Sequence, residues 1–476
     1  MAVLRGSRPL EGADAVTEPG PAGNGGAPLP SSNLRWSVLL AVLLIAVLIA
    51  GLTAWRFWSN TPSHPPDQVG VSLTSDPRTT RSQPPDQVRV SLTSDPRTSF
   101  AVVWHAATDA DGSVEILEEG DSRVFPGRPT DGTPIGPGVW RQADVTGLQP
   151  GTTYRYVVTS GKAQTGEFRF KTAPLGHHPV RFDVFGDQGD CTHYAAACRV
   201  MDGIAADRPD FVLATGDLTY ADLNGPDAWD LWANDLMRRY GTWAPLMPTV
   251  GNHEYRSGDS IGNYRGRFAL PDQKGGYMPR GRGLGDYYSF VYGSVHVVAL
   301  PEHYVDIGKN SEFLRWLRAD LEAMCSNPTI RWRIAFNHRP FYSTGRRYGA
   351  DRTQREYIAP TLERYGFDLV FSGHEHNYER SLQMRGGKPV TKNPDSWQKD
   401  AGTAYVVTGG GGAPTYNDFG PEVAWDAERE TGHHHVRVDI GVDDTLQLTA
   451  ISDEKGQRPI DQVVIEGPGK KEACPN

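Results

Sequence analysis

The chain has 476 residues, of which 38% are hydrophobic and 22% are charged. This length favours about three folding units of roughly 150 residues each. The net charge of −9 argues against a nucleic-acid binder, because such proteins carry basic patches for phosphate groups. The four cysteines are too few for a disulfide scaffold. Cys191 and Cys198 would lie about 10 Å apart on one regular helix, so a bond between them requires Cys191 to lie in a loop.

Residues 1–34 are rich in Gly, Pro and Ala without periodicity, so we expect them to be disordered. The next segment, 35–57, contains 20 uncharged residues from Trp36 to Trp55, enough for a helix of about 30 Å, the thickness of a bilayer core. We predict a single transmembrane helix with the N-terminus inside and the bulk of the chain outside the cytoplasm. A cleaved signal peptide is the alternative, which a long preceding segment and the lack of a small-residue cleavage site disfavour.

A duplicated segment follows the apolar run. Residues 65–80 (PPDQVGVSLTSDPRTT) recur at 84–99 with 14 of 16 positions identical. Two copies are too few for a solenoid, so we interpret them as one strand-forming segment of which a single copy docks. The second copy runs directly into SFAVVWHAAT and is the one that we expect to dock. Residues 58–83 then form a linker.

Residues 84–174 predict a small all-β domain. Short β-branched and aromatic runs such as SFAVVW, TYRYVV and EFRFKT alternate with turn clusters. In GLQPGTTYRYVV, Tyr154, Tyr156 and Val158 share one face after a Pro-Gly turn. This stretch resembles the corner of fibronectin type III sandwiches, in which a Tyr hydroxyl ties back to the backbone. We expect a structural role for this domain.

Residues 179–468 predict a mixed α/β domain, because apolar strand-like runs alternate with helical segments. HYAAACRVMDGIAAD is one expected helix. SEFLRWLRADLEAMC is another, with Ser311 as its N-cap. The alternating residues after His433 are typical of closing strands.

Five polar clusters each follow an apolar run in this domain. In α/β proteins, ligands bind beyond the carboxyl ends of strands, so these loops can converge on one site. Carboxylate, amide, phenol and imidazole side chains without cysteine suit Mn, Fe or Zn. The candidate ligands are Asp187, Asp217, Tyr220, Asn252, His338, His374 and His376.

The five motifs, GDQGD, GDLTY, GNHE, NHRP and GHEH, occur in the order found in the metallophosphoesterase superfamily. Within it, the chain resembles the purple acid phosphatases over roughly 84–466. The resemblance implies a two-sheet sandwich flanked by helices, after the fibronectin III-like domain. It also implies a binuclear centre: Asp187, Tyr220 and His376 hold one metal, Asn252, His338 and His374 hold the other, and Asp217 bridges both.

A phenol with a pKa near 10 needs a strongly Lewis-acidic partner, which indicates Fe³⁺ together with Fe²⁺, Zn²⁺ or Mn²⁺. We expect a membrane-anchored acid phosphatase that hydrolyses small phosphate monoesters by in-line attack of a metal-bound hydroxide. Asp217 and His253 are the expected catalytic residues, and Asn252, His253 and Arg347 the substrate contacts. A phosphodiesterase or nucleotide-hydrolysing enzyme is the alternative, and an inert surface-binding protein is a third.

Some features depart from the family pattern or carry a second interpretation. Some plant relatives place paired histidines where this chain has Arg347 and Tyr348, so the general acid is left open. Arg346 and Arg347 either contact an anionic substrate or form a solvated turn. We interpret Asp190 and Glu375 as supporting or solvated residues, 433–435 as structural histidines, and 409–412 as a turn beside the site. The oligomeric state is open.

Overall fold

The structure is a computed structural model that describes residues 83–118, 122–130, 136–256, 261–271, 286–454, 456–467 and 474. The expected disordered tail, the transmembrane segment 35–57 and the first copy of the duplicated segment lie outside these residues. In the described ranges, no helix is long and apolar enough to cross a bilayer. The membrane span therefore stays a prediction.

Two small antiparallel sheets form the N-terminal domain, with the orders β1-β2-β6-β5 and β4-β3-β7-β8, and β9 also pairs with β7. β1 belongs to the second copy of the duplicated segment, which confirms that this copy docks as a strand. The Tyr154 hydroxyl accepts a hydrogen bond from the Gln149 N–H at 2.8 Å, the backbone tie expected at this corner. The strands are β1 Asp86–Leu92, β2 Phe100–Ala106, β3 Gly112–Leu117, β4 Arg123–Pro126, β5 Arg128–Pro129, β6 Val139–Val145, β7 Thr153–Ser160, β8 Ala163–Gln164 and β9 Phe168–Lys171.

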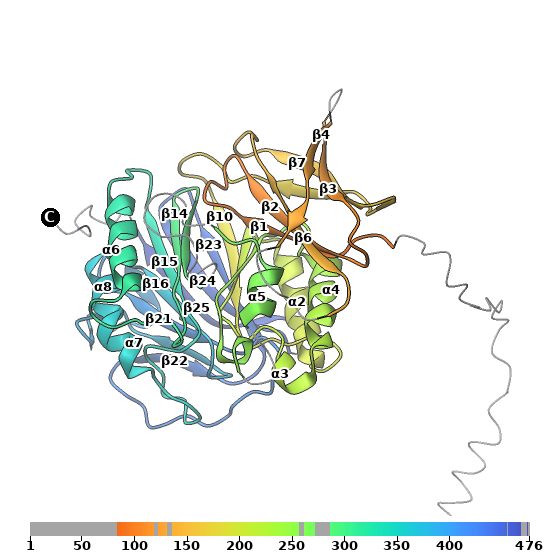
Figure 1. The fold of residues 1–476 in the computed structure, drawn as a ribbon. Helices are drawn as coiled ribbons and strands as arrows, with labels where there is room; N and C mark the ends of the chain where they lie inside the picture. The colour runs from red at the N-terminus through yellow and green to blue at the C-terminus, as the bar shows by residue number, and fades with distance from the viewer. Residues whose placement is uncertain are drawn as a thin grey trace, which may run out of the picture. The chain divides into compact units, whose positions relative to one another are not determined.

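Two seven-stranded sheets pack face to face in the second domain, and their apolar side chains form a shared core (Figure 1). Phe182 and Phe211 of one sheet contact Phe371 and Phe290 of the other, with ring centroids 6.4 and 5.5 Å apart. The first sheet comprises β12 Leu246–Pro248, β11 Phe211–Ala214, β10 Val180–Phe185, β23 His434–Ile440, β24 Thr445–Ser452, β25 Arg458–Glu466 and β20 Ser396–Gln398. The second comprises β13 Tyr288–Tyr292, β14 Val295–Ala299, β15 Trp332–Phe336, β16 Leu369–Ser372, β21 Ala404–Thr408, β17 Tyr378–Ser381 and β22 Asp426–Glu430, and β18 Met384–Arg385 pairs separately with β19 Lys388–Pro389.

Helices cover the outer faces of both sheets, which confirms the predicted sandwich flanked by helices (Figure 1). The Ser311 side chain accepts from the Leu314 N–H at 3.2 Å, so it caps α6 as predicted. The helices on the side of the first sheet are α2 Ala195–Asp207, α3 Ala221–Asn224, α4 Asp227–Arg239, the 3-10 turn η1 Asn252–Glu254 and α5 Ile261–Arg267. Those on the side of the second are α6 Glu312–Cys325, α7 Arg352–Tyr357 and α8 Ala359–Arg364.

All four cysteines form disulfides, Cys191–Cys198 and Cys325–Cys474. The expected first helix starts at Ala195, two residues later than the sequence indicated. Cys191 lies in the loop before this helix, which brings its Cα to 5.1 Å from that of Cys198. This is the condition under which the sequence allowed a bond.

A buried ion pair joins the two sheets. Arg380 on β17 donates from Nη2 to Asp461 Oδ1 on β25 at 2.9 Å, and the Tyr378 hydroxyl donates to Asp461 Oδ2 at 2.6 Å. The Arg380 and Asp461 side chains are 1% and 5% exposed. A buried charge that loses its partner is costly, so the folded domain depends on this contact.

We expect Asp461→Ala to lower the free energy of unfolding by about 3–5 kcal/mol, because it leaves the Arg380 guanidinium buried and unpaired. Urea unfolding followed by circular dichroism measures the change. Asp418→Ala is the control, because Asp418 is 73% exposed in its ion pair with Arg346. A shift in the urea midpoint no larger than that of the control would contradict the prediction.

Candidate metal centre

The five loops with the polar clusters follow β10, β11, β12, β15 and β16. β10, β11 and β12 are parallel neighbours, and so are β15 and β16. Because parallel strands end at the same edge, their following loops lie together. The structure brings all seven candidate ligands into one buried region, where each is 6% exposed or less: Asp187, Asp217, Tyr220, Asn252, His338, His374 and His376.

Asp187, Tyr220 and His376 form a first group of donor atoms. Asp187 Oδ1 lies 3.2 Å from His376 Nε2 and 3.4 Å from the Tyr220 hydroxyl. The hydroxyl lies 3.1 Å from His376 Nε2. One carboxylate, one phenol and one imidazole therefore face a common point.

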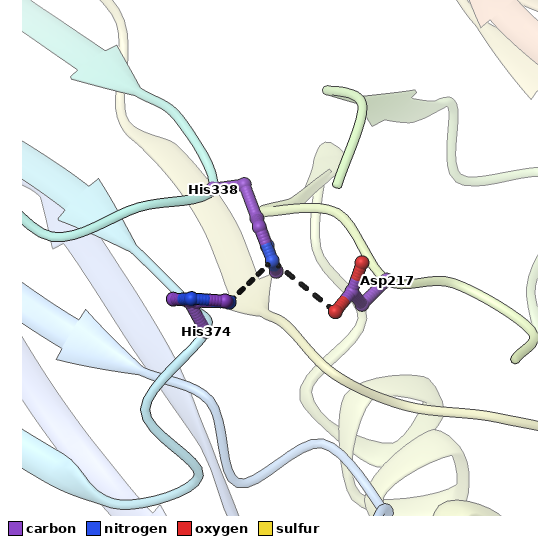
Figure 2. Close-up of side chains that lie close together, drawn as sticks. All are labelled: Asp217, His338 and His374. Atoms are coloured by element: carbon purple, nitrogen blue, oxygen red, sulfur yellow. Dashed lines mark hydrogen bonds and ion pairs between the residues drawn. The ribbon is translucent and has the colours of Figure 1, made fainter. Parts of the chain in front are cut away.

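A second group is built around His338 (Figure 2). Its Nε2 lies 3.2 Å from Asp217 Oδ2 and 3.1 Å from His374 Nδ1. Asn252 Oδ1 also lies 3.2 Å from His338 Nε2. The oxygen of the Asp217 carboxylate and the nitrogens of both rings thus converge, as the close-up shows.

Backbone carbonyls orient two of the imidazoles. His338 Nδ1 lies 2.9 Å from the Thr215 carbonyl, and His376 Nδ1 lies 2.8 Å from the Pro414 carbonyl. A ring that donates its Nδ1–H to a carbonyl keeps a lone pair on Nε2. Both Nε2 atoms face the donor groups described above, so each ring is held in the tautomer that binds a cation.

The Asn252 amide gives a direct test of whether a cation fits the second group. Its oxygen faces the ring nitrogens of His338 and His374, while its nitrogen faces the Arg256 guanidinium. A rotated amide would make ordinary hydrogen bonds to all three. The unrotated amide adds another lone pair to the converging set, which is favourable when a cation lies among these atoms. The residues of this site therefore fit metal ions.

Burial and neighbouring charges shift the pKa values of the site residues. Without a cation at the site, burial opposes ionisation of Asp217, but the charge of the protonated His338 ring and its hydrogen bond outweigh burial and hold the pKa of that carboxyl well below its usual range. Burial, and then the charges of Asp187 and Asp217, raises the pKa of Tyr220 well above its usual value. The phenol therefore keeps its proton unless a strongly Lewis-acidic cation displaces it.

Four of the site residues have a left-handed backbone. The φ angles of Asp187, Asp217, Tyr220 and His374 are 58°, 52°, 55° and 69°. Such conformations cost free energy in non-glycine residues and persist where the surrounding structure fixes them. The strain is therefore concentrated at the turns that aim the ligands inward.

His253, the expected catalytic residue next to Asn252, lies beside both donor groups. Its backbone N–H donates to Asp217 Oδ1 at 2.7 Å, and its ring lies tilted against that of Tyr220 with centroids 4.5 Å apart. The ring Nδ1 lies 2.7 Å from the Asp222 carboxylate, while Nε2 lies 3.9 Å from Asp217 Oδ2. Asp222, which the sequence did not single out, thus orients the ring.

Arg347 is exposed at the edge of the site. Its guanidinium lies 5.9 and 5.4 Å from the ring centroids of Tyr348 and Tyr416. Tyr348 stacks on His374 at 4.1 Å and Tyr416 on His376 at 4.2 Å. We call Arg347, Tyr348 and Tyr416 the rim. The sequence marked Tyr348 only as a departure from the paired histidines of plant relatives, and it did not identify Tyr416, which is far from every motif.

Of the two interpretations of Asp190 and Glu375, supporting or solvated, the structure favours the supporting one, because both are fully buried. Asp190 accepts from the Thr192 and His193 N–H groups, and Glu375 from those of Tyr348 and Gly349, so both stabilise loops.

The glycine turn at 409–412 does lie beside the site. A Cβ on Gly409 would approach Asp187 Oδ2 to 2.9 Å, so this turn requires glycine to let the ligand in.

Glu254, the last residue of GNHE, ties two of the ligand loops together. Its carboxylate accepts from the backbone N–H groups of Asp217, Leu218 and Gly251 at 2.7–2.9 Å. The sequence could have singled out Glu254 because it lies inside the GNHE motif. Its role could not be predicted, because it depends on how closely the loops after β11 and β12 approach each other. Glu254 is therefore a positioning residue for Asp217 and Asn252.

We expect Glu254→Gln to weaken metal binding by about 10- to 100-fold, because an amide nitrogen cannot accept from the same N–H groups. Titration of chelator-treated protein with Zn²⁺ measures the affinity. Glu379→Gln is the control, because Glu379 is as buried but accepts from Ser343 and Thr344. Equal affinities for the two variants would show that Glu254 does not position the ligands.

Two family models match the chain. Residues 85–172 match the "Purple acid Phosphatase, N-terminal domain", and residues 180–378 match the "Calcineurin-like phosphoesterase". An uncharacterized protein of Mycobacterium tuberculosis is 35% identical over 312 residues, which are 57% of each chain. Purple acid phosphatase 18 of Arabidopsis thaliana is 27% identical over 435 residues, 84% of this chain and 87% of that protein. The chain thus aligns with little more than half the length of the mycobacterial relative.

The structure of the purple acid phosphatase PPD1 from yellow lupin, Lupinus luteus, matches with a TM-score of 0.70. It is 22% identical, and the match covers 80% of this chain and 74% of that one. This likeness shows the same fold. With both domain models matched in order, together over more than half of its length, the chain belongs to the purple acid phosphatase family of the metallophosphoesterase superfamily.

Proposed function

We propose that this protein hydrolyses small phosphate monoesters at a binuclear metal centre. The observation that carries the proposal is the pair of convergent donor groups, one of which contains a buried phenol. Asp187, Tyr220 and His376 would hold one ion and Asn252, His338 and His374 the other. Asp217, whose Oδ2 lies 3.2 Å from His338 Nε2, would bridge them.

The residues around each ion select its type. A phenol whose pKa is raised by burial and two carboxylates favours Fe³⁺ in the first group. The second group, with two imidazoles and an amide oxygen, suits Fe²⁺, Zn²⁺ or Mn²⁺. When bound, two such ions lower the pKa of water and neutralise charge on the phosphate oxygens.

The protein residues would then position the substrate. Asp222 holds the His253 ring so that Nε2 faces the region between the donor groups, where it can bind a phosphate oxygen or exchange a proton with the leaving group. The Arg256 guanidinium lies 3.0 Å from the same nitrogen and adds positive charge there. Both side chains come from the GNHE loop and the two residues after it, and His253 lies beside Asp217.

The rim supports a role for Arg347 in binding the substrate. An exposed guanidinium next to the metal-ligating histidines can pair with an anionic ester. Tyr348, which is 46% exposed, also offers a ring on which a nucleobase could stack. This second feature is the specific reason to keep nucleotide hydrolysis as the alternative activity.

We also propose that the segment 35–57 anchors the enzyme to a membrane with the catalytic domain outside the cytoplasm. The uncharged run of 20 residues from Trp36 to Trp55 supports the anchor. The two disulfides support the location, because disulfides persist in oxidising compartments.

Tyr220→Phe should remove a visible absorption band from the purified protein, since the band would arise from a phenolate bound to Fe³⁺. Absorption spectra of both proteins, with the iron content measured in parallel, test this expectation. Tyr194→Phe is the control, because the Tyr194 ring packs against that of Tyr220 at 5.6 Å while its hydroxyl accepts from Asn224, which is not a proposed ligand. If the unaltered enzyme is colourless and free of iron but fully active, the assignment of Fe³⁺ is excluded.

With 4-nitrophenyl phosphate, bis(4-nitrophenyl) phosphate and AMP as substrates between pH 4 and 8, we expect the first to have the highest kcat/KM, by about tenfold or more. The pH optimum should lie below 7. Asp217→Asn should lose activity on every substrate, because it removes the bridging carboxylate.

The same assay tests the rim. Arg347→Ala should raise KM about fivefold with little change in kcat, the effect of losing one exposed charged contact. Arg346→Ala, whose side chain pairs with Asp418 and the Phe419 carbonyl, is the matched control. A preference for the diester would replace the monoesterase assignment, and a preference for AMP would identify a nucleotide as the favoured monoester.

A further inference from the structure

A second cluster of carboxylates and imidazole lies away from the candidate metal centre, between the first sheet and α2. It consists of Asp183 on β10, Asp207 at the end of α2, His435 on β23, and Asp453 just after β24. We call it the basal cluster. Asp183 precedes the ligand Asp187 by four residues, a separation of about 13 Å along an extended chain.

Asp183 has no hydrogen-bond partner for its carboxylate within the part of the chain that the structure describes. Its side chain is 0% exposed, and neither carboxylate oxygen has a hydrogen-bond partner. A buried ionised carboxylate without compensation is strongly unfavourable. Burial therefore raises the pKa of Asp183 well above its usual value.

The neighbouring donors have the geometry of a metal site. One ligand atom each from Asp183, Asp207 and His435 lie within 4.8 Å of one another. His435 Nδ1 lies 2.9 Å from Asp453 Oδ2, and Nε2 lies 3.0 Å from Asp207 Oδ2. A histidine that gives one ring N–H to a carboxylate and turns its other nitrogen toward further carboxylates is a typical metal ligand.

The charges allow two neutral arrangements. The cluster contains three carboxylates, those of Asp183, Asp207 and Asp453, beside the imidazole of His435. The Arg437 guanidinium adds one positive charge and donates to Asp207 Oδ1 at 2.9 Å. Protons on both His435 and Asp183 would balance the charges. A divalent cation that displaces these two protons would balance them equally well, and it would also give partners to the Asp183 oxygens.

The helix that covers the cluster leaves little room for anything larger than an ion. A Cβ on Gly203 of α2 would lie 2.4 Å from Asp453 Oδ1 and 2.8 Å from His435 Cε1. The glycine lets the helix backbone lie directly on the cluster. An ion there is shielded from solvent and connects three separate elements of the fold.

We propose that Asp183, Asp207 and His435 bind a divalent transition-metal ion such as Zn²⁺, with Asp453 orienting the imidazole. This ion is separate from the binuclear centre. It holds β10, β23 and the end of α2 together, and thereby fixes the strand that leads to Asp187. Its role is structural, since no substrate reaches a cluster covered by α2.

The metal content of the purified full chain tests the proposal. We expect Asp183→Asn to contain one metal equivalent less than the unaltered chain after loading with Zn²⁺ and gel filtration. Asp217→Asn should still contain the metal equivalent that depends on Asp183. The double variant Asp183→Asn, Asp217→Asn should lack that metal equivalent. Asp210→Asn is the control for removing a shielded carboxylate, because Asp210 binds the Arg181 N–H and the Tyr292 hydroxyl outside both clusters.

The competing arrangement predicts the opposite results. If protons balance the charges, Asp183→Asn keeps the full metal content and unfolds at the same or a higher temperature, and the proposal is wrong. If Asp183→Asn does not fold, crystals of the unaltered protein soaked in Zn²⁺ decide the matter at the zinc absorption edge. An anomalous peak beside the Asp183 carboxylate supports the site, and no peak there excludes it.

Discussion

The alignment of parallel strand ends is the constraint on which the rest of the site depends. β10, β11 and β12 end at one edge of the first sheet, and β15 and β16 end at the facing edge of the second. Each strand delivers one loop, so ligands from five distant parts of the sequence meet without any long excursion of the chain. The apolar core between the sheets keeps these edges in register, and the Arg380–Asp461 pair reinforces it.

Bringing the seven candidate ligands together in a buried region costs free energy, which other interactions must offset. Buried carboxylates, imidazoles and a phenol repel or compete for protons unless cations lie among them. The left-handed turns at Asp187, Asp217, Tyr220 and His374 add strain. Packing of the core offsets part of this cost. Carboxylates such as Glu254 offset another part, because they accept hydrogen bonds from the backbone N–H groups of the ligand loops.

The N-terminal domain contributes structure to this arrangement. Its Tyr156 hydroxyl donates to the Thr242 carbonyl of the second domain at 2.7 Å, and the Val90 N–H donates to the Gly241 carbonyl at 2.9 Å. These contacts lie at the end of α4, which packs on the first sheet. The domain thus supports the helical layer behind β10 and β11 and contributes none of the seven candidate ligands.

The sequence by itself determined the elements and the ligand types. Alternating apolar runs predicted the strands, Ser311 predicted the start of α6, and the five motifs named all seven candidate ligands, because each of these signals is local. Tertiary structure decided which residues from remote segments of the chain contact one another. It paired Cys325 with Cys474, placed Asp222 against His253, stacked Tyr416 on His376, and buried Asp183 beside His435. No spacing along the chain encodes such contacts, because they form only when strands far apart in sequence pack side by side.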